Sequence, residues 1–287
     1  MAKIIDCEKY VSSLEANILS EINKNKISTT LLIINTTNDN ASEIYVRNKI
    51  KKCEKFGLNA TVVKFKIEDY DSIEKMQLSI LQCILEANNN KNIGGIILQL
   101  PVQDGINYIE LVDAIEPYKD VDGLNYYNNA LLYKGLSSIK PATADGIYRL
   151  LSYNNINFDG KNIVIVGRSL LVGKPLFHIL EQQNATVTLA HSHTKGLKQI
   201  TKKADIVICA IGKPKYFDNT YFKSNAIIVD VGINRDDENK ICGDVNSSTL
   251  TEKQSYTPVP KGIGIVTSTM VVYNLIKCYN VYKNMNS

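Results

Sequence analysis

The sequence has no long apolar run and few of the signals that would place a protein outside a reducing compartment. None of its apolar stretches approaches the roughly 20 residues needed to cross a bilayer. Its first residues, MAKIIDCEKYVSSLEANI, lack an apolar core followed by a small-residue cleavage site. The six cysteines are scattered and form no Cys-x-x-Cys pair, which disfavours a zinc site and a disulfide framework. We expect a cytoplasmic protein with reduced thiols and no membrane partner.

Strong charge and internal repetition are also lacking. The formal net charge is +4, which permits acidic small molecules as ligands but is weak evidence for a nucleic acid partner. No repeat of the solenoid type is found. The chain does have 287 residues, of which 44% are hydrophobic, enough for the cores of one large domain or two ordinary ones.

The first half alternates strand and helix patterns. The short apolar runs TTLLIINTT, NATVVKFKI and IGGIILQLP predict buried strands at residues 29–37, 59–67 and 93–101. Helix-periodic segments separate them, and this βαβα order predicts a parallel sheet covered by helices. A stretch rich in Asn, Tyr and Gly follows at residues 120–143, and we interpret it as a loop that connects two domains.

A second alternation begins at residue 161. Strands are predicted at residues 161–167, 185–192, 205–212 and 225–234, with helices between the first three. A Gly/Pro loop and a long amphipathic helix close the chain. Two successive alternations of this kind predict the α/β class with two domains.

The loop VGRSLLVG at the end of the first strand of this second half is a candidate phosphate cradle. Free backbone N–H groups and the dipole of the following helix would face an anion there. The loop is not the usual G-x-G-x-x-G, so a plain strand-to-helix turn is the alternative. The next strand ends in LAHSHTKG, without the acid that grips the ribose of NAD. Arg168 in the loop and Ser192 after the strand suit a 2′-phosphate instead, which favours NADP.

Tyr45 and Lys49 lie one helical turn apart in EIYVRNKIKKCEKFGL, so both side chains leave the same face. The apolar stripe of Val46, Ile50 and Cys53 runs beside them. A side chain at the edge of such a stripe is partly desolvated, and desolvation lowers the pKa of a lysine from its free value of about 10.4. Lys49 is therefore a candidate acid–base group, and a solvated helix face is the alternative.

Gln99, Asp120 and Asp122 are further candidates in the first half. Gln99 ends a strand in ILQLP, and ligands of open α/β sheets bind at the carboxyl ends of strands. Asp120 and Asp122 stand in KDVDG before a glycine turn. The alternatives are a strand-capping glutamine and a turn-forming aspartate.

Taken together, these segments resemble a known family. YVRNKIKKCEKFGL, GGIILQLPVQDGIN, PYKDVDGLN, KNIVIVGRSLLVGKPL, ATVTLAHSHT, ADIVICAIGKP, IIVDVGIN, GDV and TPVPKGIG follow one another as in the bifunctional methylenetetrahydrofolate dehydrogenase/methenyltetrahydrofolate cyclohydrolases. The resemblance implies two α/β domains around a cleft and a homodimer active in one-carbon metabolism and purine biosynthesis. It implies a folate-binding catalytic domain at residues 1–140, completed by the final helix at 267–287, and a Rossmann-like NADP-binding domain at 141–266.

The resemblance also implies roles for single residues. Lys49 matches the catalytic lysine and Tyr45 its aromatic partner, Gln99 matches the glutamine that works with the lysine, and Asp122 matches the aspartate that holds the pterin. The catalytic residues implied are thus Tyr45, Lys49, Gln99 and Asp122. The substrate contacts implied are Tyr45, Gln99, Leu100, Pro101, Asp122 and Gly264. The cofactor contacts implied are Gly167, Arg168, Ser169, Gly173, Ser192 and Ile233. No metal is implied.

Two stretches depart from the family pattern. Residues 141–146 are PATADG, whereas the family usually has Pro-Cys-Thr-Pro followed by a basic residue and Gly. Asp145 therefore stands in place of a Lys or Arg. Residues 261–267 are KGIGIVT, with Lys261 and Ile265 in place of a glycine and a proline. These changes bear on nicotinamide placement and on the balance of the two activities. A dehydrogenase with little cyclohydrolase activity, and a folate- or NADP-binding protein without catalysis, are the alternatives to the bifunctional enzyme.

Overall fold

The computed structural model describes residues 2–37, 39–136 and 139–285. Its contacts divide the chain into two compact units, each with its own parallel sheet. The three-stranded unit consists of Glu15–Ala142 and Ser268–Ser287, and the six-stranded unit of Met1–Leu14 and Thr143–Thr267. No helix in the described part of the chain is long and apolar enough to cross a membrane.

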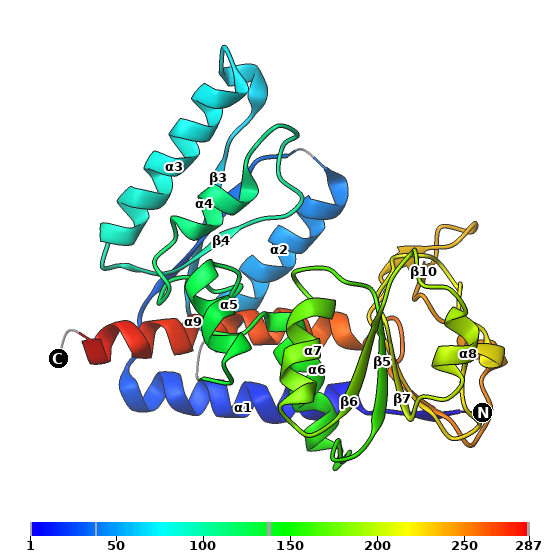
Figure 1. Ribbon diagram of the computed structural model, residues 1–287. Helices are drawn as coiled ribbons and strands as arrows, with labels where there is room; N and C mark the ends of the chain where they lie inside the picture. The colour runs from blue at the N-terminus through cyan, green and yellow to red at the C-terminus, as the bar shows by residue number, and fades with distance from the viewer. Residues whose placement is uncertain (1, 38, 137–138, 286–287) are drawn as a thin grey trace. The chain divides into compact units, whose positions relative to one another are not determined.

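The three-stranded unit has a parallel sheet in the order β3-β2-β4. Helix α2 packs against β3, and α3 packs against β4 and α4 (Figure 1). The strands are β2 (Thr30–Asn35), β3 (Asn59–Lys64) and β4 (Ile93–Leu98). The helical elements are η1 (Ile67–Asp69), α2 (Asn40–Lys55), α3 (Ile73–Asn89), α4 (Tyr108–Asp113) and α5 (Tyr126–Tyr133), with most of α1 (Cys7–Asn25) and α9 (Ile263–Met285).

Burial on both faces explains why the central strand of this sheet is a continuous apolar run. Leu31, Ile33 and Ile34 of β2 have no exposed surface, as is typical of a parallel strand between two helical layers. One glycine in β4 lets α9 approach the sheet, since a β carbon on Gly95 would lie 2.7 Å from Cδ1 of Leu275. The three predicted strands of the first half are thus confirmed.

The six-stranded unit has the order β1-β11-β8-β7-β5-β6, with every pairing parallel. Its strands are β1 (Lys3–Ile4), β5 (Asn162–Val166), β6 (Thr186–Ala190), β7 (Ile206–Cys209), β8 (Ile227–Asp230) and β11 (Ser255–Tyr256), beside the antiparallel pair β9 (Asn234–Arg235) and β10 (Ile241–Cys242). Its helical elements are α6 (Ala142–Tyr153), α7 (Gly173–Glu181), α8 (Leu197–Thr201), η2 (Asn219–Tyr221) and η3 (Ser247–Thr249). The predicted α/β class and the four strands predicted for this half are confirmed.

Two features differ from the reading of the sequence. The contacts group residues 1–14 with the six-stranded unit, because the two-residue strand β1 pairs with β11; so short a strand has no periodicity to read. The stretch at 120–143, interpreted as a loop, contains α5. Its Asn-rich sequence has low helix propensity, but Asn125 caps the helix by accepting from the N–H of Asn128 at 2.9 Å.

Candidate active site

Helix α2 places Tyr45 and Lys49 at the edge of its buried face. The helix begins at a capping aspartate, Asp39, whose carboxylate accepts from the N–H of Ser42 at 2.8 Å. Val46 on its inner face is 3% exposed. Lys49 is half-buried, and Tyr45 is 43% exposed. Partial loss of hydration raises the pKa of the Tyr45 hydroxyl above its usual value. The two side chains are therefore placed as the sequence predicted, between core and solvent.

Gln99 meets Lys49 at the carboxyl end of β4. The N–H of Gln99 donates to the carbonyl of Ile34 at 2.9 Å, which extends the pairing of β4 with β2 by one residue. The side-chain oxygen of Gln99 accepts from Nζ of Lys49 at 2.8 Å, and its amide nitrogen donates to the carbonyl of Leu100 at 2.6 Å. Gln99 is 6% exposed, and both the oxygen and the nitrogen of its side-chain amide are hydrogen-bonded. The orientation of the amide is therefore fixed. A cis peptide bond joins Leu100 to Pro101.

Asp122 follows a short extension of the same sheet. Val121 donates to the carbonyl of Ile96 in β4 at 3.3 Å, and Gly123, at φ +66°, turns the chain away. A β carbon on Gly123 would lie 2.7 Å from the carbonyl oxygen of Ile139. Asp122 is half-buried, and no residue in the described part of the chain donates a hydrogen bond to its carboxylate. Its two oxygens are therefore available to a ligand.

Asp120 has the structural role that was the alternative for Asp122. It is 1% exposed. Its carboxylate accepts from the N–H of Asn125 at 2.9 Å and from the side-chain amide of Asn128 at 3.1 Å, which fixes the start of α5. Burial raises the pKa of this carboxyl to about 7. The two aspartates of KDVDG thus have different roles, since the first holds the turn and the second has no hydrogen-bond donor among the described residues.

Lys119, which the reading of the sequence missed, anchors the KDVDG segment. It is 1% exposed, and its Nζ donates to the carbonyls of Ala87, Asn88 and Asn90, each at 2.8 Å. These carbonyls lie at the C-terminal end of α3, where few backbone donors are left, so a buried cation caps that helix. Burial lowers the pKa of Lys119 to about 8. The sequence alone carries no signal for this role, because most lysines are exposed.

Tyr108 at the start of α4 lies close to the same segment and was also missed. Its hydroxyl is buried, and it has no hydrogen-bond partner among the residues that the structure describes. Burial, reinforced by the nearby charges of Asp122 and Asp120, raises the pKa of Tyr108 well above its usual value. The hydroxyl therefore stays protonated and can act as a donor beside Asp122.

In the six-stranded unit, the loop from Gly167 to Gly173 has the tight geometry of a phosphate cradle. Gly167 has a φ of +127°, and a β carbon on Gly173 would overlap the carbonyl of Gly167. The hydroxyl of Ser169 accepts from the N–H of Val172 at 3.1 Å and so shapes the loop. Helix α7 begins at Gly173. The loop thus leads directly into a helix N-terminus, where the helix dipole favours anions.

The other residues expected to contact the cofactor lie at the same edge of the sheet. Arg168 and Ser192, after β5 and β6, are exposed. Ile233, after β8, is 46% exposed, and a β carbon on Gly264 would lie 3.0 Å from its Cδ1. The carboxyl ends of parallel strands are the usual ligand-binding edge of such a sheet.

Each of the two departures from the family pattern places a charged residue in an ion pair. Asp145 is buried in the first turn of α6, and one of its oxygens pairs with Nε of Arg149 at 2.7 Å in the same helix. Its other oxygen is buried without a hydrogen-bond partner among the described residues. Lys261 adopts a left-handed φ of +69°, where the family's glycine would be unstrained, and its Nζ lies 3.1 Å from the Glu8 carboxylate.

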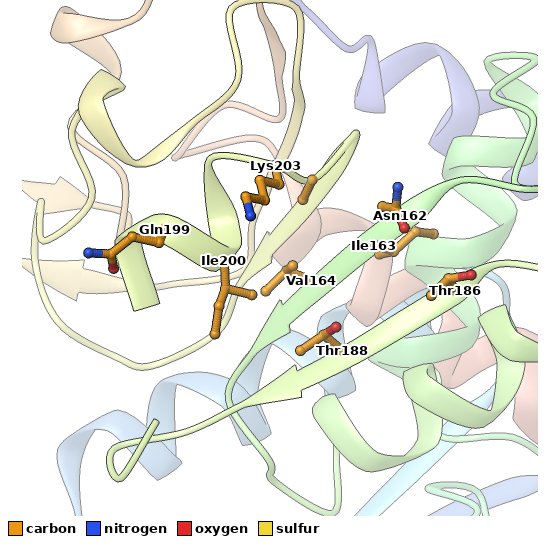
Figure 2. A pocket seen from close by; sticks show the side chains of 9 residues that line it. Asn162, Ile163, Val164, Thr186, Thr188, Gln199, Ile200 and Lys203 are labelled. Atoms are coloured by element: carbon orange, nitrogen blue, oxygen red, sulfur yellow. The ribbon is translucent and has the colours of Figure 1, made fainter. Parts of the chain in front are cut away.

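A separate depression is lined by residues of β5, β6 and the region of α8, and by none of residues 167–173 (Figure 2). It lies beside the first halves of β5 and β6, and Ile200 and Lys203 line it from the region of α8. Its volume is about 260 Å³. The residues expected to contact the cofactor follow the carboxyl ends of β5 and β6, so the depression is distinct from the candidate cofactor site. In the described residues, no group of three or more His, Cys, Asp or Glu side chains is arranged to hold a metal ion.

A parallel sheet with a glycine loop at a helix N-terminus defines a nucleotide-binding α/β protein, and the comparisons with known proteins make this specific. The family model for the catalytic domain of tetrahydrofolate dehydrogenase/cyclohydrolase matches residues 5–122, and the model for its NAD(P)-binding domain matches residues 141–283. The bifunctional protein FolD of Agathobacter rectalis is 40% identical over 281 residues, covering 96% of this chain and 99% of the relative.

Solved structures agree. The bifunctional FolD methylenetetrahydrofolate dehydrogenase/cyclohydrolase of Campylobacter jejuni has a TM-score of 0.92 at 32% identity, covering 98% of this chain and all of that one. The methylenetetrahydrofolate dehydrogenase-cyclohydrolase of Trypanosoma brucei, solved with NADP and an inhibitor, has a TM-score of 0.88 at 25% identity, covering 98% of each chain. The chain belongs to the tetrahydrofolate dehydrogenase/cyclohydrolase family.

Proposed function

We propose that the protein oxidises 5,10-methylenetetrahydrofolate to 5,10-methenyltetrahydrofolate with NADP, and then hydrolyses the methenyl compound to 10-formyltetrahydrofolate. Family membership over almost the whole chain supports both activities. The observation that carries the proposal is the hydrogen bond between Lys49 and Gln99, because it places an amine in a fixed position at a ligand-binding edge of the three-stranded sheet. We assign folate binding and catalysis to the three-stranded unit, and dinucleotide binding to the six-stranded unit.

The two reactions make different demands on the protein. In the first, a hydride leaves the bridging methylene carbon and the folate becomes a delocalised cation, so the protein positions two rings and moves no proton. In the second, water attacks that cation, loses a proton, and a ring nitrogen is protonated as the ring opens. Only the second step needs an acid–base group, and Lys49 is the group that the site offers.

Gln99 and Tyr45 support Lys49 in this scheme. Because the Gln99 amide is held by the carbonyl of Leu100, its oxygen points at the amine and orients it. Tyr45 has 43% of its surface exposed next to the lysine and offers an aromatic face on which folate rings can stack. Leu100 and Pro101 follow Gln99 directly and form the adjoining wall of the substrate site.

Asp122 is assigned to the pterin. A pterin presents a 2-amino group and a ring N–H side by side, and one carboxylate accepts from both in a bidentate pair. The Asp122 carboxylate has no donor of its own in the described residues, so binding a pterin would break no internal hydrogen bond. Lys119 and Asp120, which both precede Asp122, hold the segment in place through their own hydrogen bonds.

The residues at the edge of the six-stranded sheet fit NADP. A loop that has room only for glycine at Gly167 and Gly173 lets a pyrophosphate approach the start of α7. Arg168 and Ser192 would hold the 2′-phosphate, Ser169 shapes the loop, and Ile233 would border the nicotinamide, with Gly264 beside it on the substrate side. When bound, the nicotinamide accepts the hydride. The further proposals are a homodimer, a cytoplasmic location and a supply of one-carbon units to purine biosynthesis, all on the family resemblance; the six free cysteines suit a reducing compartment.

One assay separates this proposal from its alternatives. Purified protein is mixed with 5,10-methylenetetrahydrofolate and NADP, and methenyltetrahydrofolate absorbance is followed together with NADPH. The bifunctional enzyme produces NADPH with little lasting methenyl compound. A dehydrogenase alone accumulates the methenyl compound beyond its spontaneous hydrolysis, and a binding protein produces neither signal.

A further inference from the structure

Asp244, in the sequence GDV, is a buried carboxylate that organises the loop after β7. It has no exposed surface. One oxygen accepts from the N–H groups of Ile211 at 2.6 Å and Gly212 at 3.2 Å, and the other accepts from the N–H of Lys213 at 2.9 Å. The second oxygen also accepts from the side-chain amide of Asn234 at 2.9 Å. A single side chain thus joins the segments that follow β7 and β8.

Asp230 at the end of β8 holds Asp244 in turn. Its carboxylate accepts from the N–H groups of Gly232 at 3.0 Å, Asp244 at 2.9 Å and Val245 at 2.9 Å. It is 3% exposed. The two aspartates therefore interlock. Asp230 accepts from the backbone N–H of Asp244, and Asp244 accepts from the side chain of Asn234, which follows Asp230 on the same segment.

Two glycines allow this interlock. A β carbon on Gly232 would overlap the Asp244 carboxylate, and a β carbon on Gly243 would overlap the Asp230 carboxylate. Both positions therefore require glycine for close approach rather than for a special backbone angle. The family motifs GIN and GDV acquire a physical reason, since in each the glycine makes room for the aspartate of the other segment.

The segments held by Asp244 lie at the edge assigned to the cofactor. Ile211 follows Ala210, and a β carbon on Gly167 would overlap the Ala210 carbonyl, so the loop after β7 adjoins the phosphate cradle. Ile233, assigned to the nicotinamide, lies between Gly232, which touches the Asp244 carboxylate, and Asn234, which is bonded to it. Because the N–H groups of residues 211–213 are already used by Asp244, they are not available to a phosphate.

We infer that Asp244 is a positioning residue for the dinucleotide: its carboxylate holds the 211–213 loop and Ile233 in the conformation that NADP binds, and Asp230 keeps it in place. The inference rests on the proposed function. Asp244 itself, with no exposed surface, touches neither substrate nor cofactor. It acts through the backbone and through Asn234.

The test is the substitution Asp244→Asn, which keeps the size of the side chain. It replaces one acceptor oxygen by an NH2 group, which cannot accept the hydrogen bonds that the oxygen receives from the loop or from Asn234. We expect the KM for NADP to rise about tenfold, the usual scale for loss of a hydrogen bond to a charged acceptor. Hydrolysis of added methenyltetrahydrofolate, measured without NADP, reports on the other unit and is expected to persist. The matched control is Asp205→Asn, which also removes a carboxylate that accepts from a backbone N–H group in this unit. Asp205 directly precedes β7 and accepts from the N–H of Asn162 at the start of β5 and from Nζ of Lys223, at the end of the sheet opposite the 211–213 loop.

The outcomes are distinct. A raised KM for NADP in the Asp244 variant, with the control unchanged, supports the inference. A lower melting temperature with an unchanged KM shows a merely structural role and overturns it. If Asp244→Asn does not fold, Asn234→Ala decides in its place, because it breaks one of the four bonds: a raised KM for NADP supports the inference, and an unchanged KM overturns it. Wild-type protein without NADP-dependent oxidation would instead overturn the proposed function.

Discussion

Nζ of Lys49 on α2 donates a hydrogen bond to the side-chain oxygen of Gln99, 50 positions further along the chain and directly after β4, at 2.8 Å. The bond gives the amine one fixed neighbour, and the described part of the chain offers its Nζ no other hydrogen-bond acceptor. A lysine held in this way at the carboxyl edge of a parallel sheet is placed to act on a bound substrate.

Lys49→Met is expected to abolish the cyclohydrolase and to leave measurable NADP-dependent dehydrogenase activity. The reason is that only the hydrolytic step moves a proton, and the methionine fills the space without an acid–base group. Methenyltetrahydrofolate should accumulate during the coupled reaction. The measurement follows methenyltetrahydrofolate absorbance in the purified variant, with and without NADP. Lys51→Met is the control, because Lys51 is an exposed lysine on the same helix. Normal hydrolysis of added methenyltetrahydrofolate by the Lys49 variant would return Lys49 to the role of a solvated charge.

Asp122→Ala is expected to impair both activities, since both folate substrates carry the pterin edge. Loss of a charge-assisted contact of roughly 1.5–3 kcal/mol corresponds to about a 10- to 150-fold weaker binding of folate. Thermal unfolding and folate affinity are measured side by side, with the exposed Asp104→Ala as the control. Since Asp120 and not Asp122 holds the turn, we expect little change in stability. A folded variant with normal folate affinity would remove Asp122 from the site.

Arg168→Ala is expected to raise the KM for NADP much more than the KM for NAD, because only NADP carries the 2′-phosphate. The contact is of the charge-assisted type, worth roughly 1.5–3 kcal/mol. Initial rates with both dinucleotides give the comparison. Lys161→Ala serves as the control, since Lys161 is exposed and precedes β5, at the opposite end of that strand. Efficient use of NAD by the wild-type protein would show that the missing acid after β6 does not set the preference.

The sequence predicts the elements of this fold far better than the bonds that hold its loops. Strands β2 and β5 are short β-branched runs between turn signals, and such runs show their burial locally. The partners of Lys119 lie about 30 positions away, and those of Asp244 up to 33 positions away. Nothing near either residue in the sequence distinguishes it from a solvated charge, because hydrogen bonds from a side chain to distant backbone leave no periodic pattern.

The candidate site shows the same division. Spacing alone placed Tyr45 and Lys49 on one face, but it left open whether Gln99 was a strand cap or a partner. The structure brings Gln99 to Lys49 because the parallel register of β2 with β4 fixes where β4 ends relative to the end of β2, from which the chain continues into α2. For Asp122 the sequence left open a turn-forming role, and it did not distinguish the role of Asp120. Only the contacts show that the first aspartate is bonded to α5.

The buried carboxyl of Asp120 makes a prediction about stability and pH. Its pKa is raised by burial to about 7, whereas an aspartate in an unfolded chain has a pKa of about 3.9. Between these values the folded protein keeps a proton that the unfolded chain releases. The free energy of unfolding therefore falls as pH rises from 4 to 7 and is unaffected by this group at higher pH. The decrease is at most about 4 kcal/mol, or three pH units at 1.36 kcal/mol each.

Asp120→Asn removes this dependence while keeping the turn, because the amide oxygen can accept the hydrogen bonds from Asn125 and Asn128. We expect the stability of the variant relative to wild type to increase steadily from pH 4 to pH 7 and then to level off. Urea unfolding of both proteins across that range gives the difference, and the exposed Asp104→Asn shows the effect of losing an ordinary carboxylate. Parallel pH profiles for Asp120→Asn and wild type would mean that Asp120 is ionised throughout the range, held in that form by the donors at the start of α5.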